Sequence, residues 1–87
     1  MKIKNGFVIR QVGGEHVVVP VGERSKEFHG MINMNATGAF LWNFFSQDHT
    51  LKEGVDALCN EYKVERELAE TDVKRFIDVL ERNGFTE

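Results

Sequence analysis

The sequence contains little cysteine and proline and no long apolar run. Its 87 residues include one cysteine, Cys59, and one proline, Pro20. A single cysteine excludes an internal disulfide framework and a zinc site built from several cysteines. Apolar runs span only a few residues, so no segment reaches the roughly 20 residues of a transmembrane helix. The N-terminal residues also lack the apolar stretch of a secretory signal. We therefore expect a soluble cytoplasmic protein.

The composition is otherwise that of an ordinary globular protein. Hydrophobic residues make up 41% and charged residues 29% of the chain, which disfavours intrinsic disorder. A chain of this length fits one domain and buries roughly 60–70% of its unfolded surface. That is enough for one core but not for a core and a deep active site, so we expect a single domain over residues 1–87.

The net charge of −3 is distributed unevenly. Residues 1–34 carry five basic and three acidic side chains, whereas residues 35–87 carry six basic and eleven acidic ones. Contacts with phosphates dominate the affinity of proteins for nucleic acids. The acidic second part therefore argues against a nucleic-acid surface there.

Aromatic and β-branched residues in the first 34 positions predict a small antiparallel sheet. Gly13-Gly14 separates two such runs, and two glycines supply the positive φ angles of a two-residue hairpin turn. Pro20 cannot donate a hydrogen bond to a sheet, so it is expected to end the second strand. The polar segment 21–27 predicts a surface loop. The expected strands are Phe7–Val12, His16–Val19 and Phe28–Met34.

From residue 35 onward the apolar residues have helical spacing. Asn35 is a favourable N-cap for a first helix, and Thr50 with Glu53 forms a capping box for a second. A third helix is expected from about Glu65 to Asn83, because the glycine that follows favours a helix end. The predicted fold class is α+β, with a three-stranded antiparallel sheet followed by three helices. This set of elements is winged-helix-like.

Residues suited to catalysis or metal binding are few and scattered. His16, His29 and His49 lack the spacing of a metal site, and a pair of histidines across two strands would make a poor zinc site. Cys59 lies on the apolar stripe of the second helix, which is typical of a buried, inert thiol. We expect no catalytic residue, no metal and no cofactor.

Two classes of binding protein remain. In a winged-helix DNA-binding regulator the third helix would enter the major groove by its N-terminal end, but residues 65–72 hold four acidic side chains and one basic one. A peptide-binding module would instead use the last strand, which has a glycine, no proline and few charges and is therefore open to another strand. That edge is equally consistent with coverage by a neighbouring helix.

The segment Met34–Trp42, MNATGAFLW, resembles the "LNxTGxxIW" signature of the PqqD family, the recognition elements for precursors of ribosomally synthesised, modified peptides (RiPPs). The order of strands and helices around it is also similar, from about Gly6 to Phe85. Asn35 caps the first helix, Thr37 can bond at its first turn, and Gly38 permits the close approach of another element. Most of this motif is therefore structural.

The resemblance implies a non-catalytic peptide chaperone. In the family, the leader segment of a precursor peptide adds as a strand beside the third strand, and its apolar side chains enter a groove next to the third helix. The implied partners are this leader peptide and a modifying enzyme, often a radical-SAM enzyme, in the biosynthesis of PQQ or another RiPP; no nucleic acid or membrane partner is implied. The expected peptide-binding residues, some of which must also hold the core, are His29, Gly30, Met31, Ile32, Asn33, Met34, Val73, Lys74, Phe76, Ile77 and Leu80.

Overall fold

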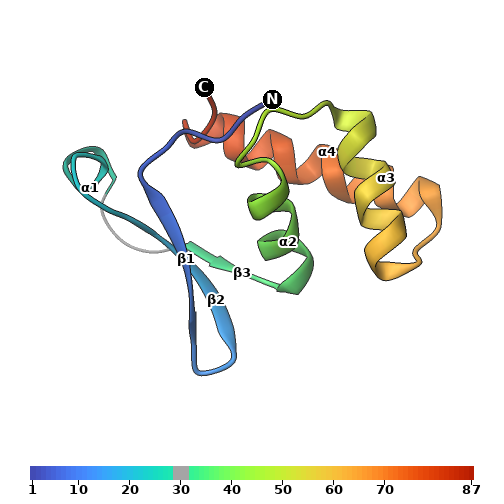
Figure 1. The fold of residues 1–87 in the computed structure, drawn as a ribbon, viewed down its shortest axis with the longest axis horizontal. Helices are drawn as coiled ribbons and strands as arrows, with labels where there is room; N and C mark the ends of the chain where they lie inside the picture. The colour runs from blue at the N-terminus through green and yellow to red at the C-terminus, as the bar shows by residue number, and fades with distance from the viewer. Residues whose placement is uncertain (29–31) are drawn as a thin grey trace.

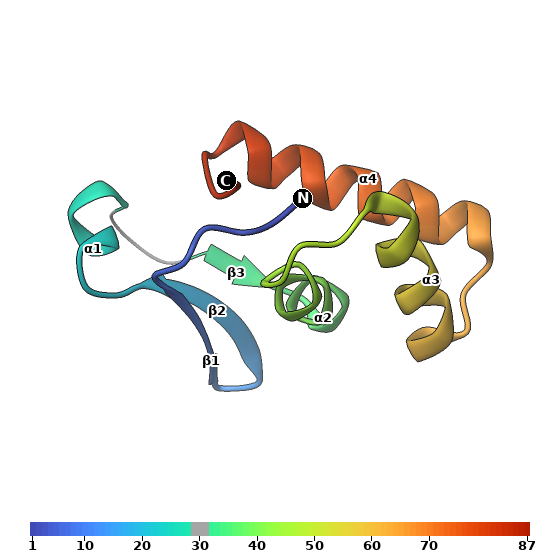
Figure 2. The same ribbon diagram turned by 45° about the horizontal axis from the view of Figure 1, so that its top comes forward.

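The computed structural model describes residues 1–28 and 32–87 and confirms the predicted α+β class. Its sheet is antiparallel, with the strand order β1-β2-β3. Helix α2 lies between the sheet and α3, and α4 extends along one side of the molecule from α3 toward β3 (Figures 1 and 2). In chain order the elements are β1 (Phe7–Val12), β2 (Glu15–Pro20), α1 (Arg24–Glu27), β3 (Ile32–Met34), α2 (Ala36–Phe44), α3 (Leu51–Tyr62) and α4 (Arg66–Arg82).

The hairpin between β1 and β2 has the predicted two-residue turn. Gly13 and Gly14 have φ angles of 57° and 85°, in the region that favours glycine. Val12 and Glu15 are paired across the turn, and Pro20 is the last residue of β2. The hairpin was therefore predicted correctly from the sequence.

The connection between β2 and β3 differs from the prediction. Segment 21–27 is not a loop throughout, because residues 24–27 form the short helix α1. Arg24 stabilises this turn: its Nε donates to the Asn5 carbonyl at 2.8 Å, and its guanidinium forms an ion pair with Glu27 at 3.0 Å. Strand β3 is shorter than predicted, since Phe28 lies outside it. Residues 29–31 lie outside the described part of the chain.

The ends of the long helices agree with the predicted caps. The Asn35 side chain accepts a hydrogen bond from the Gly38 amide at 2.8 Å. Thr50 and Glu53 form both hydrogen bonds of the capping box, at 2.8 and 3.1 Å. Helix α4 ends before Gly84, which has a φ angle of 76°.

The core lies between the sheet and the helices and also includes both ends of the described chain. Ile3 and Phe85 are 2% and 4% exposed, and a β-bridge joins Ile3 to Thr86. The Phe85 ring packs against Phe7, Phe28 and Trp42. The other buried residues of the core cluster are Val18, Leu41, Trp42, Phe45, Val55, Leu58, Ala69, Val73 and Leu80.

Within residues 1–28 and 32–87, none of the helices is both long enough and apolar enough to span a membrane.

Candidate functional site

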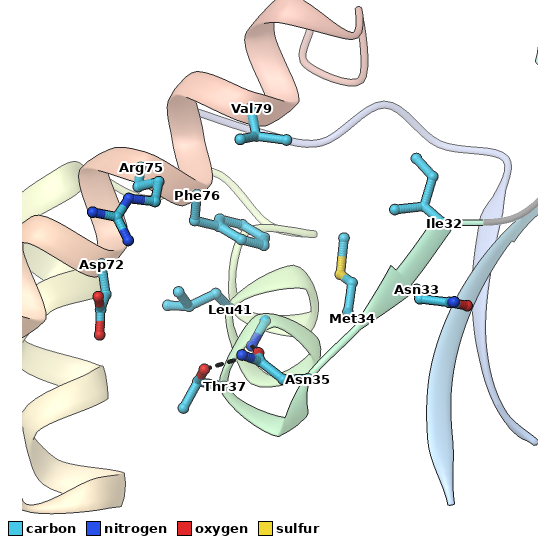
Figure 3. A pocket seen from close by; sticks show the side chains of 11 residues that line it. Ile32, Asn33, Met34, Asn35, Thr37, Leu41, Asp72, Arg75, Phe76 and Val79 are labelled. Atoms are coloured by element: carbon cyan, nitrogen blue, oxygen red, sulfur yellow. Dashed lines mark hydrogen bonds between the residues drawn. The ribbon is translucent and has the colours of Figure 1, made fainter. Parts of the chain in front are cut away.

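A groove with a volume of about 350 Å³ lies between strand β3, the first half of α2 and helix α4 (Figure 3). Side chains from these three elements point into it, so the groove exists only once the chain has folded. Its floor and walls are mainly apolar, and its polar groups gather toward the start of α2. The lining residues are Ile32, Asn33, Met34, Asn35, Thr37, Gly38, Leu41, Asp72, Arg75, Phe76 and Val79.

Strand β3 contributes alternate side chains to the groove. Successive residues of a strand point to opposite faces, and Ile32 and Met34 project toward α4 whereas Asn33 projects the other way (Figure 3). A β-carbon at Gly38 would lie only 3.3 Å from Cβ of Met34. The glycine of the signature therefore allows α2 to begin close to β3, as predicted.

Helix α4 contributes one stripe of side chains. Asp72, Phe76 and Val79 are spaced by four and three residues, which places them along one side of a helix. Phe76 is half-buried, whereas Val79 is 48% exposed. The Phe76 ring lies opposite Met34 across the groove (Figure 3).

Four of the α4 residues predicted for the site are not among the described residues that line the groove. Val73 and Leu80 are 0% and 1% exposed and belong to the core, so they support the groove from behind without lining it. Lys74 and Ile77 lie on the other flank of the helix, in a separate hollow that also contains Leu51. Each residue of a helix is rotated by about 100° from the next, and this rotation turns Ile77 away from the side to which Phe76 points.

The polar end of the groove is formed where α2 begins. Thr37 Oγ1 donates to Asn35 Oδ1 at 3.0 Å (Figure 3). Asp72 and Arg75 face this end from α4. Among residues 1–28 and 32–87, neither of these charged side chains has an ion-pair partner.

Strand β3 is an open edge of the sheet as far as the chain is described. It pairs with β2 on one side through Ile32, Asn33 and Met34, and no described strand lies on the other side. An unpaired strand edge presents N–H and C=O groups that can bind another extended chain. The edge predicted as available is therefore uncovered by any described strand and borders an apolar groove.

The glycine turn determines which backbone groups of β3 face this edge. A two-residue turn is closed by a hydrogen-bonded pair, here Val12 and Glu15, and hydrogen-bonded and non-hydrogen-bonded pairs alternate along an antiparallel ladder. By this count Val17, two residues beyond Glu15, directs its N–H and C=O toward β1. Its partner on β3 is Asn33. We infer that Asn33 directs its own N–H and C=O away from β2, toward the open edge.

The described residues that were considered for catalysis or metal binding, namely His16, His49 and Cys59, form no common metal site. No group of three His, Cys, Asp or Glu residues that could hold a metal occurs in the described part of the chain. Cys59 is half-buried and packs against the core. His29 lies outside the described residues, and so does any pairing of His29 with His16 across the strands.

The fold and the groove define a class of protein with a small antiparallel sheet, one edge strand open, and a helix that forms an apolar groove beside that edge. This geometry can hold an extended polypeptide segment. Residues 15–85 match the family model of coenzyme PQQ synthesis protein D (PqqD). The chain therefore belongs to the PqqD family, as the resemblance of Met34–Trp42 to the family signature predicted.

Two solved structures are similar to this chain over almost its whole length. One is described as TbiB1 in complex with the TbiA(beta) leader peptide; it has a TM-score of 0.74 and 26% sequence identity, and the match covers 100% of this chain and 95% of that chain. The other, lasso peptide synthetase B1 complexed with the leader peptide, has a TM-score of 0.70 and 23% identity over 95% and 92% of the two chains, and shows the fold alone. No curated protein matches the chain.

Several groove residues were not predicted as part of the site. Leu41 belongs both to the core and to the lining of the groove, and Asp72 was considered only as part of an acidic helix end. Val79 was not considered at all. One signal was available in the sequence, because Asp72, Phe76 and Val79 share a helical face. Only the packing of α4 shows that this face looks toward β3.

Proposed function

We propose that this protein is a non-catalytic peptide chaperone. It binds the leader segment of a ribosomally synthesised precursor peptide as an additional strand beside β3 and presents the peptide to a modifying enzyme. The observation that carries the proposal is the open edge at Asn33, which lies directly beside the apolar groove that Met34 and Phe76 line. Backbone pairing would supply affinity for any extended chain, and the groove would supply selectivity through alternate side chains.

Membership of the PqqD family supports this proposal. The similar structure of TbiB1 supports it as well, because that structure is described as a complex with a leader peptide. Within the site, Ile32, Asn33 and Met34 would contact the peptide from the strand and Phe76 from the helix. Val79 would enlarge the apolar surface on which its side chains pack, and Leu41, which is 2% exposed, would close the floor of the groove. Contacts from His29, Gly30 and Met31 stay predictions.

The chemistry would belong to the partner enzyme. Among the described residues that line the groove there is no cysteine or histidine, and its charged side chains, Asp72 and Arg75, lie toward its polar end. A radical-SAM enzyme or another peptide-modifying enzyme would act on the bound precursor, in the biosynthesis of PQQ or of another RiPP. The chain would act as one peptide-binding domain. Because precursor peptides of this kind are made by ribosomes, it would act in the cytoplasm.

Within residues 1–28 and 32–87, no feature of α4 favours DNA binding. The first turns of α4 would have to enter the major groove, but this end presents Glu67, Glu70 and Asp72. Its single basic side chain, Arg66, forms ion pairs with Asp56 at 2.7 Å and with Glu70 at 3.7 Å. Acidic side chains at this end repel phosphates, which argues against the winged-helix regulator.

A pair of variants at one residue tests the proposal. The ligands are synthetic leader segments from short reading frames that neighbour this gene, and binding is measured by isothermal titration calorimetry. Asn33→Pro removes the outward N–H and should weaken the affinity at least about tenfold, since ladder hydrogen bonds contribute about 1 kcal/mol each and the proline ring also obstructs the edge.

Asn33→Ala is the matched control, because it keeps the N–H and loses only a side chain that projects away from the groove. It should bind nearly as well as the native chain. Circular dichroism checks that both variants are folded. Equal affinities of a folded Asn33→Pro variant and the native chain would show that the peptide does not bind as a strand beside β3.

A further inference from the structure

The groove changes character along its length. Ile32 and Val79 face each other at one end, and Met34 and Phe76 occupy the middle (Figure 3). At the other end, where α2 begins, the groove meets Asp72 of α4. A peptide lying in this groove would therefore pass from a section lined by these four apolar side chains to one that contains a carboxylate.

The charge around this carboxylate is predominantly negative. Asp72 is half-buried, and it has no ion-pair partner within residues 1–28 and 32–87. The preceding turns of α4 add Glu67 and Glu70, and their one cation, Arg66, already pairs with Asp56 and Glu70. Arg75 is the basic residue of the groove, but it is exposed and lies at the rim. An acidic end of this kind favours a positively charged ligand group.

Two residues along a β-strand cover nearly the same distance as the four residues of α4 from Asp72 to Phe76. Asp72 precedes Phe76 by four residues, which corresponds to about 6 Å along a helix axis. Two residues of a β-strand correspond to about 6.6 Å, and side chains two residues apart point to the same face. When one side chain of an added strand packs on Phe76, the side chain two residues away therefore reaches Asp72.

The direction of the added strand decides whether the peptide residue beside Asp72 comes before or after the residue that packs on Phe76. All the pairings of the described sheet are antiparallel, and antiparallel pairing is the more stable kind. A strand antiparallel to β3 would run from the Met34 end of the groove toward the Ile32 end. Its residue beside Asp72 would then come before the residue on Phe76.

We propose that Asp72 is a specificity-determining residue that selects a lysine or arginine of the peptide, placed two residues before an apolar side chain that packs on Phe76. The inference rests on the proposed function and adds the chemistry and direction of the sequence that the groove recognises. The ion pair lies at the rim of an apolar surface, where a charge contributes modestly to affinity and more to the choice of partner.

The test is a selection from a display library of random twelve-residue peptides, carried out in parallel on the native chain and three variants. Asp72→Lys reverses the charge inside the groove. Asp78→Lys makes the same change in net charge on α4 but outside the groove, where Asp78 pairs with Arg82 at 3.1 Å. Asn33→Pro closes the open edge. Native selection should enrich lysine or arginine two residues before an apolar residue, and Asp72→Lys should enrich aspartate or glutamate at that position.

The best native peptide is then synthesised with lysine, glutamine or glutamate at this position and titrated by fluorescence anisotropy. The lysine form should bind about fivefold more tightly than the glutamate form, the order should reverse with Asp72→Lys, and Asp78→Lys should behave as the native chain does. Equal binding of the three peptides, or a basic residue enriched after the apolar one, would overturn this inference and leave the proposed function intact. If the native chain enriches peptides no more strongly than the Asn33→Pro variant does, both this inference and the proposed function are overturned.

Discussion

Val73 and Phe76 lie three residues apart on α4, but Val73 is completely enclosed by the core whereas Phe76 turns toward β3 and lines the groove. Three residues rotate a helix position by about 300°, so the two side chains are neighbours on its surface without sharing an environment. The relationship separates the residues that hold α4 in place from those that are available to a ligand, and the two kinds should respond differently to substitution.

Truncation of Phe76 should mainly affect binding. Phe76→Ala removes the ring opposite Met34, and we expect the affinity for a leader peptide to fall about tenfold or more. Ile77→Ala is the matched control, because Ile77 is also partly buried against the core but lies on the other flank of α4. Calorimetry on both folded variants makes the comparison. Similar losses of affinity in the two variants would place the peptide outside this groove.

Truncation of Val73 should affect stability alone. Val73→Ala removes two methyl groups from a fully buried position, and we expect the free energy of unfolding to fall by about 1–3 kcal/mol. Urea denaturation followed by circular dichroism measures this change. At temperatures where the variant is fully folded, its affinity for the peptide should equal that of the native chain. A stable Val73→Ala variant with weakened binding would mean that Val73 itself contacts the ligand.

Gly54 in α3 is required by the packing of Phe45. A β-carbon at Gly54 would lie 2.6 Å from Cζ of Phe45 and 3.3 Å from Cγ1 of Val73, and both of these side chains are fully buried. Gly54→Ala should therefore lower the free energy of unfolding by about 1–2 kcal/mol, although alanine is the better helix former. Asn60→Ala, at an exposed position of the same helix, should be neutral or slightly stabilising in the same urea titration. A stabilised Gly54→Ala variant would contradict this account of the core.

The capping box of α3 should make stability depend on acidic pH. The hydrogen bond from the Thr50 amide, followed by the interaction with His49, lowers the pKa of Glu53 below its ordinary value of 4.5. A carboxyl whose pKa is lower in the folded state stabilises the protein above its unfolded pKa. This contribution should disappear as the pH falls from about 4.5 through the lower folded pKa.

Urea midpoints at neutral and acidic pH, compared between the native chain and Glu53→Gln, isolate this contribution. The native chain should lose more stability than the variant between the two conditions. Glu81→Gln replaces an exposed glutamate without an ion-pair partner in the described chain and should keep the native pH dependence. If Glu53→Gln kept the pH dependence of the native chain, Glu53 would not be its source.

Salt should affect peptide binding only weakly. A β-ladder and apolar contacts are insensitive to ionic strength, so the leader affinity should change by less than about tenfold between roughly 50 and 200 mM salt. Binding to duplex DNA would instead fall by about three orders of magnitude or more over this range, because condensed counterions are released. Parallel titrations of a leader peptide and of duplex DNA make the comparison. Tight DNA binding with a steep salt dependence would identify a DNA-binding protein.

The sequence alone determined the features that depend on near neighbours in the chain. The turn at Gly13-Gly14, the caps at Asn35 and Thr50 and the end of α4 were all predicted correctly. Each rests on backbone dihedral angles or hydrogen bonds that span at most a few residues. The signature beginning at Met34 likewise identified the family, since its capping residue and glycine serve a local junction between β3 and α2.

Only the tertiary structure decided which surfaces these elements present. The apolar stripe of α4 is wide enough to face several directions, and its packing alone separates Val73 from Phe76 and Ile77. The burial of Ile3 and Phe85 likewise depends on a bridge between the two ends of the chain. Such contacts join residues that are distant in sequence, and their free energy comes from the apolar area removed from water when whole elements meet. No local sequence pattern determines which elements meet.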